Sequence, residues 1–178
     1  MIKNNLTIKK TLDDLRKKEL SSKELTRLCL EKIKKEDKEI NAFITLDEKG
    51  AIEQAKRADD LISKGNNLPL LGIPIALKDI FLTRGIRTTA GSKVLKDYIP
   101  QYDATVVSKL KNAGAVIIGK TNCDAWAHGS SGENSDYGPT KNPYNKNYVP
   151  GGSSSGSAAA VASDFVLLAT VTDTGGSI

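Results

Sequence analysis

The sequence predicts an α/β protein in which helices cover a mixed, largely parallel β-sheet. Short apolar runs, which are typical of buried strands, alternate along the chain with amphipathic helical segments. This alternation favours a parallel or mixed sheet with helices on both faces. The amino-acid composition also changes near residue 67, from charged helical segments to stretches rich in Gly, Ser and Thr. We therefore expect one domain over residues 1–178, with a helical N-terminal region (1–66) and a core portion (67–178).

In the N-terminal region, apolar residues recur at helical spacing in three segments, and a short apolar run lies between two of them. Ser21 and Glu24 have the spacing of a capping box, which marks the start of a helix. Gly65 is placed to end the last of the three helices. The expected elements are helix Thr7–Leu20, helix Ser22–Lys35, strand Ile40–Leu46 and helix Glu48–Lys64.

In the core portion, compact apolar runs alternate with helical patterns. Pro74 opens the first run, a position at which a strand tolerates proline. Gly114 follows a helical segment and is expected to end it. The expected elements are strand Ile73–Leu77, helix Asp103–Ala113, strand Ala115–Ile118, a small-residue helix over Ser157–Ser163 and strand Phe165–Val171.

The bulk composition narrows the class of protein. The chain has 178 residues, of which 39% are hydrophobic and 26% charged, which is enough for one domain with a genuine core. The net charge of +5 could suggest nucleic acid, but the lysines are mixed with Asp and Glu, as on solvated helix faces. No Arg-rich stripe or aromatic platform is evident, so we do not expect this segment to bind nucleic acid directly.

The same composition bears on location and metal content. No apolar run is long enough to span a bilayer, and Met1–Lys10 is polar and basic, without the apolar core of a signal peptide. We therefore expect no membrane contact and a cytoplasmic location. Cys29 and Cys123 are far apart in sequence, which favours reduced thiols over a disulfide, and they are too few for a structural zinc site. No metal is expected in this chain.

One motif points to a nucleotide site, but its own residues argue against that interpretation. Gly114–Thr121 fits the phosphate-binding pattern GxxxxGK[ST] letter for letter. The pattern needs its variable residues in an exposed loop, whereas here they are Ala, Val, Ile and Ile, the composition of a buried strand. We therefore interpret the segment as a strand preceded by a helix-ending glycine.

Lys78 is the first candidate functional residue. It ends the apolar run Ile75-Ala76-Leu77, where a sheet presents side chains to a cleft. Burial disfavours the ammonium form, so a lysine in this place can act as a base. The alternative is a lysine that reaches the surface and pairs with Asp79.

Two glycine- and serine-rich turns follow later in the chain. Gly151–Ser157 precedes an Ala-rich helix and predicts either a hydroxyl-lined turn at a helix N-terminus or a flexible linker. Asp173–Ser177 has two glycines before its serine, which suits an exposed hydroxyl surrounded by backbone N–H groups. Taken alone, the second turn is as well explained by a glycine turn between strands.

These features gain meaning together, because a serine nucleophile needs a base. The chain has a single histidine, His128, and no serine-elbow motif to partner it. An arrangement of two serines and a lysine needs no histidine: Lys78 takes a proton from Ser153, and Ser153 takes one from Ser177.

On these residues the sequence resembles the amidase signature family. The GGSS start and the DTGGSI end of Gly151–Ser177 match its signature, and the two serines, 24 positions apart, have its spacing. The resemblance implies that Lys78 is the base, Ser153 a bridging serine that follows a cis peptide bond, and Ser177 the acyl nucleophile. It also assigns supporting roles: an oxyanion hole from the amides of Thr174, Gly175, Gly176 and Ser177, a loop held by Asp173, and substrate contacts from Gly129 and Ser130.

A narrower resemblance is to one branch of that family, the A (glutaminase) subunits of aspartyl/glutamyl-tRNA amidotransferases. Gly132–Pro143 and Val149–Ser153 carry it, and the N-terminal helices are similar too. It implies hydrolysis of glutamine to supply ammonia to a complex with B and C subunits, which amidates misacylated tRNA. The partner subunit would use ATP and Mg²⁺ and bind most of the tRNA, and no cofactor is expected in this chain.

The sequence also departs from the family. Family members are much longer, so the resemblance implies a sheet that is incomplete at its C-terminal side. Thr170-Val171 replaces the Leu-Gly that is more usual in the family. The residues of Asn122–His128 also differ from the common family sequence of that segment. Two alternatives therefore stay open: a stand-alone amidase that acts on another amide, and an inactive interaction fragment.

Overall fold

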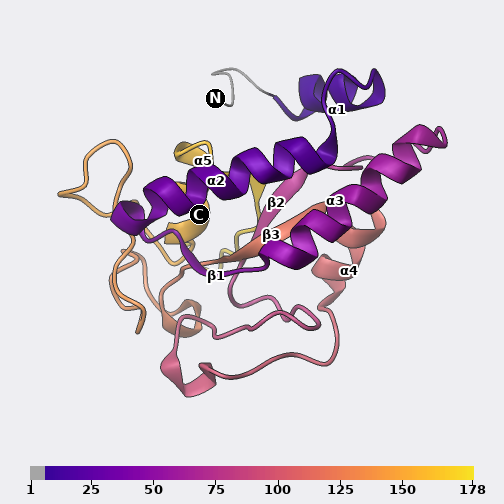
Figure 1. Ribbon diagram of the computed structural model, residues 1–178. Coiled ribbons are helices and arrows are strands. Elements are labelled where there is room, and N and C mark those ends of the chain that lie inside the picture. Colours follow the sequence, from indigo (N-terminus) through magenta and orange to yellow (C-terminus); the bar gives the residue numbers. More distant parts are fainter. Residues whose placement is uncertain (1–6) are drawn as a thin grey trace.

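The computed structural model describes residues 7–178 and has helices on both faces of a four-stranded sheet (Figure 1). The strand order is β1-β3-β2-β4, with β2 parallel to both β3 and β4 and β1 antiparallel to β3. The predicted mixed, largely parallel sheet is confirmed. The elements are α1 (Ile8–Arg16), α2 (Ser22–Ile40), β1 (Phe43–Leu46), α3 (Glu48–Ser63), β2 (Pro74–Lys78), the 3₁₀ turn η1 (Lys93–Leu95), α4 (Thr105–Asn112), β3 (Val116–Thr121), the 3₁₀ turn η2 (Ala125–Ala127), α5 (Ser155–Ala162) and β4 (Leu168–Ala169).

The N-terminal helices begin within one residue of the predicted positions, but α1 ends earlier than predicted, at Arg16, and α2 ends later. Ser21 Oγ accepts a hydrogen bond from the Glu24 N–H at 3.0 Å, which caps α2. The helix then continues to Ile40 and ends at Asn41, which has the left-handed conformation with φ 61°. The predicted strand Ile40–Leu46 is therefore wrong at its start, because the first residues of that run belong to α2 and its cap.

In the core portion the elements are confirmed in kind and differ in length. Helix α4 begins at Thr105, two residues after the predicted start, and the Asp103 carboxylate before it accepts the Arg84 N–H at 2.8 Å. Strand β3 runs on to Thr121, which confirms that the phosphate-loop pattern is a buried strand. Strand β4 is reduced to Leu168–Ala169, since Phe165 and Val166 instead pack against the core beside α5.

A β-bulge controls which side chains face which side of the sheet. The pairing of β2 with β3 passes from Ile75↔Ile117 to Ala76↔Gly119, so Ile118 is an extra residue. After an extra residue the alternation of side chains changes phase. As a result Lys78, the last residue of β2, lies on the α5 face, and Lys120 on β3 lies on the opposite face.

Three hydrophobic clusters lie between the sheet and the helices that cover it. Helices α2 and α5 pack on Ala76 and Ile118, while α3 packs its buried alanines on Val116. On the other face, Val107 of α4 packs with Ile75, Leu77 and Ile117. No helix within residues 7–178 is long and apolar enough to cross a membrane. Residues 1–6 of the predicted polar start lie outside the described residues.

Candidate active site

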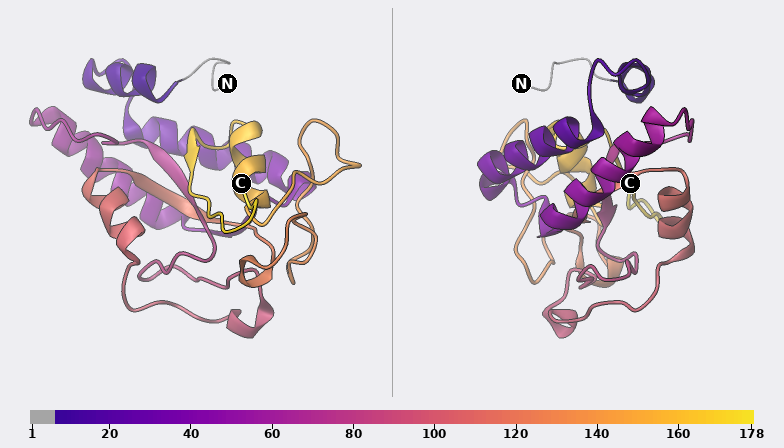
Figure 2. Two further views of the ribbon diagram at one scale, coloured as in Figure 1. Left: turned by 180° about the vertical axis from the view of Figure 1, so that it is seen from behind. Right: turned by 45° about the vertical axis from the view of Figure 1, so that its right-hand side comes forward.

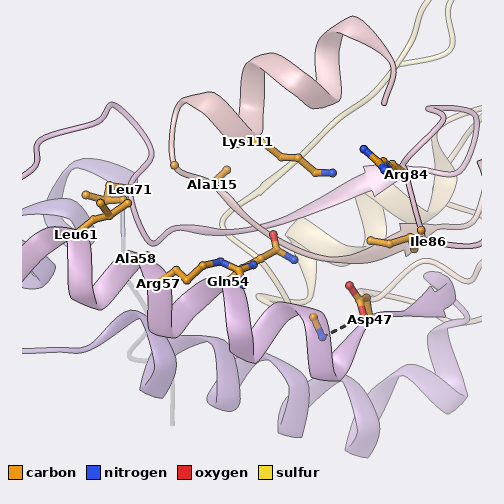
Figure 3. Close-up of a pocket in the computed structure, with 13 residues that line it drawn as sticks. Asp47, Gln54, Arg57, Ala58, Leu61, Leu71, Arg84, Ile86, Lys111 and Ala115 are labelled. Atoms are coloured by element: carbon orange, nitrogen blue, oxygen red, sulfur yellow. Dashed lines mark hydrogen bonds between the residues drawn. The ribbon is translucent and has the colours of Figure 1, made fainter. Parts of the chain in front are cut away.

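Two cavities of similar size are candidates for the active site. The first, about 460 Å³, lies between α3, the turn at Arg84–Ile86 and the end of α4 (Figure 3). No serine, threonine or cysteine lines it. The Lys111 ammonium that points into it is held by both Asp103 oxygens at 2.7 and 2.8 Å. This cavity therefore lacks a nucleophile beside a free base.

The second cavity, about 390 Å³, lies where α5 begins, beside the C-terminal segment of the chain. Seen from behind, α5 and this segment lie next to each other (Figure 2). Both glycine- and serine-rich turns reach it, through Gly152 and Ser154 from one and Gly176 and Ser177 from the other, together with Ser130. Ser130 and Ser177 of the predicted residues thus line one cavity, whereas Ser153 is buried beside it and is not among its lining residues. Within residues 7–178 no hydrogen bond joins Ser153 to Ser177.

Lys78 lies directly behind this cavity and is fully buried. Its Nζ lies within hydrogen-bond distance of three hydroxyl groups: Ser153 Oγ at 2.7 Å, Ser154 Oγ at 2.9 Å and Thr172 Oγ1 at 2.7 Å. Within residues 7–178 no carboxylate oxygen lies within 4.0 Å of Nζ. The alternative in which Lys78 reaches the surface and pairs with Asp79 is therefore wrong, because Asp79 pairs with Lys120 instead.

The surroundings of Lys78 shift its protonation equilibrium towards the neutral amine. Burial lowers the pKa of Lys78 below its ordinary value, against the opposing effect of Cys123, Asp124 and Asp173. Burial also raises the pKa of the Cys123 thiol to about 12, so that group stays uncharged near neutral pH. A lysine held by hydroxyl groups in a dry site is suited to accept a proton.

The turn that carries Ser153 is fixed by close backbone contacts. The Gly152–Ser153 peptide bond is cis, as the family resemblance implied. At Gly156 in α5, an added Cβ would lie 2.4 Å from Ala42 O and from Asn122 N, so only glycine fits there. Ser157 of the same helix donates to Thr170 O at 2.8 Å, which joins α5 to the segment after β4. The turn is thus a packed structure, and the flexible-linker alternative is wrong.

The loop that carries Ser177 is organised by Asp173. Asp173 Oδ1 accepts the N–H groups of Gly175 at 2.8 Å and Gly176 at 2.5 Å, as expected of a residue that holds the loop. These backbone hydrogen bonds, that from Gly176 foremost, lower the pKa of Asp173. Two of the four amides predicted to form the oxyanion hole thus contact a carboxylate here. Ser177 is 8% exposed, whereas Thr174 is exposed.

The remaining predicted residues separate into those at the cavity and those away from it. Ser130 lines the cavity, and its carbonyl accepts the Gly152 N–H at 2.8 Å. Gly129, beside it, packs against the Asp124 carboxyl group. His128 is exposed and is not among the residues that line the cavity.

A model of the Amidase family matches residues 24–178 of this chain. The chain belongs to the amidase family. The match covers every residue of the cluster around Lys78, from β2 to the end of the serine-bearing loop. Of the helices and strands that the structure describes, only α1 and the first two residues of α2 lie outside that range.

Relatives within the amidase family include proteins of two kinds. The A subunit of glutamyl-tRNA(Gln) amidotransferase from Geobacter metallireducens is 55% identical over 98% of this chain, which covers 36% of that protein. The peptide amidase of Stenotrophomonas maltophilia is 38% identical with a TM-score of 0.92, over 98% of this chain and 37% of that one. The corresponding glutamyl-tRNA(Gln) amidotransferase protein of Thermotoga maritima, also an A subunit, is 40% identical with a TM-score of 0.74, over 95% and 35%. The chain thus spans about a third of the length of the curated relatives it matches.

Sequence reasoning missed three hydroxyl residues of the site. Ser154 and Thr172 both accept from Lys78 Nζ, and Thr170 Oγ1 accepts the Lys78 N–H at 2.8 Å. Thr170 and Thr172 are two residues apart, so an extended segment turns both hydroxyls to the same side. That alternation could have revealed Thr170 and Thr172. No feature of the sequence distinguishes Ser154 from the neighbouring serines.

Proposed function

We propose that this chain is the glutaminase part of a tRNA-dependent amidotransferase and hydrolyses the side-chain amide of glutamine. The observation that carries amide hydrolysis is the contact between Lys78 Nζ and Ser153 Oγ at 2.7 Å, in a buried site beside the cavity that Ser177 lines. The choice of glutamine rests on the 55% identity to the A subunit of a glutamyl-tRNA(Gln) amidotransferase.

In the proposed mechanism, Ser177 Oγ attacks the amide carbon. Its proton passes to Ser153 Oγ while the proton of Ser153 passes to Lys78 Nζ, which the lowered pKa of Lys78 favours. The tetrahedral intermediate then loses ammonia, which takes up the proton from Lys78 through Ser153. Water then attacks the glutamyl ester, and its proton passes through Ser153 to Lys78. The same proton returns through Ser153 to Ser177 Oγ as the ester bond breaks, which releases glutamate and frees Ser177.

The oxyanion would be stabilised by backbone amides of the loop Thr174–Ser177. Because the Gly175 and Gly176 N–H groups donate to Asp173 Oδ1, they have to turn from that carboxylate to reach an oxyanion. Substrate binding and reorientation of the loop are therefore coupled in this proposal. Gly129 and Ser130 would contact the substrate across the cavity.

The proposal includes the partners that such an enzyme needs. Ammonia would pass to B and C subunits in a cytoplasmic complex, where the partner uses ATP and Mg²⁺ to amidate misacylated tRNA. No group of three His, Cys, Asp or Glu side chains among residues 7–178 is arranged to hold a metal ion. In this proposal the chain contributes the amide-cleaving residues and not the nucleotide chemistry.

Ser177→Ala tests the proposal in the product of the whole reading frame, co-expressed with its partner subunits. We expect ammonia release from glutamine to fall by on the order of 10⁴-fold or more, because the nucleophile is lost. Ser163→Ala is the matched control, since its hydroxyl is buried at the end of α5 and has no hydrogen-bond partner in the described part of the chain. Undiminished ammonia release by Ser177→Ala would refute the assignment.

A stand-alone amidase is the second candidate, and the TM-score of 0.92 to a peptide amidase favours it. The same three residues would then act on another amide. Stimulation of ammonia release by partner subunits and charged tRNA separates the two functions. An enzyme that cleaves peptide amides equally well without any partner would favour the second candidate.

A further inference from the structure

We propose that Asp124 is a positioning residue that holds the substrate-facing turn Gly129–Gly132 against the serine relay. This inference rests on the proposed function, because it concerns the same site. Asp124 follows β3 and is fully buried. It lies in the segment Asn122–His128, whose amino-acid sequence departs from the common family pattern.

Asp124 joins three segments of the chain through its backbone and its carboxylate. Oδ2 accepts the Gly132 N–H at 3.0 Å and Oδ1 accepts the Asn134 N–H at 3.1 Å. The Asp124 N–H donates to Ser153 O at 3.2 Å. One residue is therefore bonded both to the turn that carries Ser130 and to the bridging serine.

The glycines around the Asp124 carboxylate leave it almost no free space. A Cβ added at Gly152 would lie 2.2 Å from Asp124 Oδ2 and 2.6 Å from Gly132 N. A Cβ added at Gly129 would lie 2.5 Å from Asp124 Cγ. Since the Gly152 N–H also donates to Ser130 O at 2.8 Å, the turn and the cis peptide are packed directly on the carboxylate.

The negative charge of Asp124 is also unusual for its place. Among the described residues no lysine, arginine or histidine nitrogen lies within 4.0 Å of its oxygens, and backbone N–H groups alone satisfy it. A buried carboxylate is costly unless it is hydrogen-bonded or paired. A neutral side chain could accept the same hydrogen bonds from the turn. We therefore infer that the negative charge of Asp124 has a second effect, on a neighbouring group.

The charge acts on Lys78. The groups that face Lys78 are Asp124, Asp173 and Cys123, and the cysteine is uncharged near neutral pH because burial raises its pKa to about 12. Both carboxylates raise the pKa of Lys78, in opposition to burial, which lowers it. Removing the Asp124 charge should therefore lower the pKa of Lys78 further. Because activity needs the neutral amine, the acid limb of kcat/KM should move to lower pH.

Asp124→Asn in the whole protein with its partner subunits is the test. The variant replaces one acceptor oxygen by an NH₂ group that faces a backbone donor, so the turn is displaced. We expect kcat for glutamine hydrolysis to fall by about 100-fold, since a small misplacement of catalytic groups has effects of that size. Asp37→Asn is the matched control, because Asp37 also accepts two backbone N–H groups, those of Ala42 and Phe43, and is not among the groups that shift the pKa of Lys78.

The outcomes separate a positioning role from a structural one. A lower kcat and a shifted acid limb in Asp124→Asn, with wild-type values of both in Asp37→Asn, support the inference. An unchanged acid limb in Asp124→Asn overturns it, even if the melting temperature falls. If Asp124→Asn does not fold, Asp124→Ser removes the charge without placing an NH₂ group against a donor, and the same readings apply.

A direct titration keeps the inference separate from the proposed function. The Lys78 side chain is followed by NMR in protein with ¹³C-labelled lysine, and its signal is identified by its loss in Lys78→Met. Failure of the wild type to hydrolyse glutamine refutes the proposed function alone. A pKa of Lys78 that is equal in wild type and Asp124→Asn refutes the inference, and a lower pKa in the variant supports it.

Discussion

Lys78 and Lys120 are neighbours on adjacent strands, and both are fully buried, yet their surroundings differ. Lys120 Nζ lies 3.2 Å from Asp79 Oδ1 and donates to Phe81 O at 2.8 Å and Thr88 Oγ1 at 2.7 Å. Among residues 7–178, the hydrogen-bond partners of Lys78 Nζ are all hydroxyl groups, on the opposite face of the sheet. The difference shows how one fold pairs one buried lysine with a carboxylate and surrounds the other with hydroxyl groups.

The environment of each lysine follows from the bulge at Ile118. Without the extra residue, Lys78 and Lys120 would not be separated onto opposite faces in this way. Burial lowers the pKa of both lysines, but at Lys120 the Asp79 carboxylate acts in direct contact against that effect. We therefore expect Lys78 to carry the chemistry and Lys120 the stability of the strand ends.

Lys78→Met should have the largest effect on activity. Without its base, the Ser153 relay cannot deprotonate Ser177, and ammonia release should fall by on the order of 10⁴-fold. The melting temperature should be retained within a few degrees, because methionine fills a similar volume without a buried amine. Calorimetry and an ammonia assay on the same sample check both parts. If Lys78→Met is inactive only because it unfolds, the contrast between a catalytic Lys78 and a structural Lys120 is contradicted.

Lys120→Met should have the opposite profile. It leaves Asp79 buried without its cation, a change that typically costs about 3–5 kcal/mol of unfolding free energy. Denaturant unfolding measures the loss. Asp79→Asn combined with Lys120→Met should recover part of it, because the unpaired charge is removed. Wild-type stability of Lys120→Met alone would contradict the assigned role.

The pH dependence of kcat/KM sharpens the comparison further. Because the relay needs neutral Lys78, kcat/KM should fall about tenfold per pH unit below the pKa of Lys78. That pKa is lowered by burial, so the acid limb should lie below the ordinary range of lysine. A rate profile over a broad pH range locates the limb, and a limb at the ordinary lysine value would contradict a buried base.

Thr172→Val should have the smallest effect of the four. It removes one of three hydroxyl groups around Lys78 Nζ and keeps the shape of the side chain. A neutral hydrogen bond contributes about 0.5–1.5 kcal/mol, so kcat/KM should fall by roughly threefold to tenfold. Thr105→Val, at the start of α4, is the control. A loss as large as that of Lys78→Met would mean that Thr172 takes part in the relay itself.

The sequence predicted the elements well because they leave local signals, and the roles of Lys78, Ser153 and Ser177 stay predictions. Strand ends, helix caps and apolar runs each depend on a few consecutive residues, as at Ser21 and Gly114. The lysine and the two serines were found by residue type and by family resemblance. What local patterns could not provide was the phase change at Ile118, which depends on pairing between strands distant in sequence.

The missed residues share a physical reason. Asp124, Ser154 and Thr172 matter because of what lies next to them in space, and their neighbours in sequence say little about it. The late end of α2 has a similar cause: Asp37 accepts the Ala42 and Phe43 N–H groups and thereby holds the chain after the helix. Such capping by a residue inside the helix leaves no pattern that distinguishes it from a surface carboxylate.

The close contact at Gly156 has a consequence for mutational scans of this protein. Any side chain there meets Ala42 O and Asn122 N at 2.4 Å, so substitutions at this glycine remove folded protein without touching a reacting atom. A scan scored only by growth or turnover would rank Gly156 beside Ser177. Scoring cellular abundance in parallel would separate the two, because loss at the serine leaves the amount of protein unchanged while loss at the glycine depletes it.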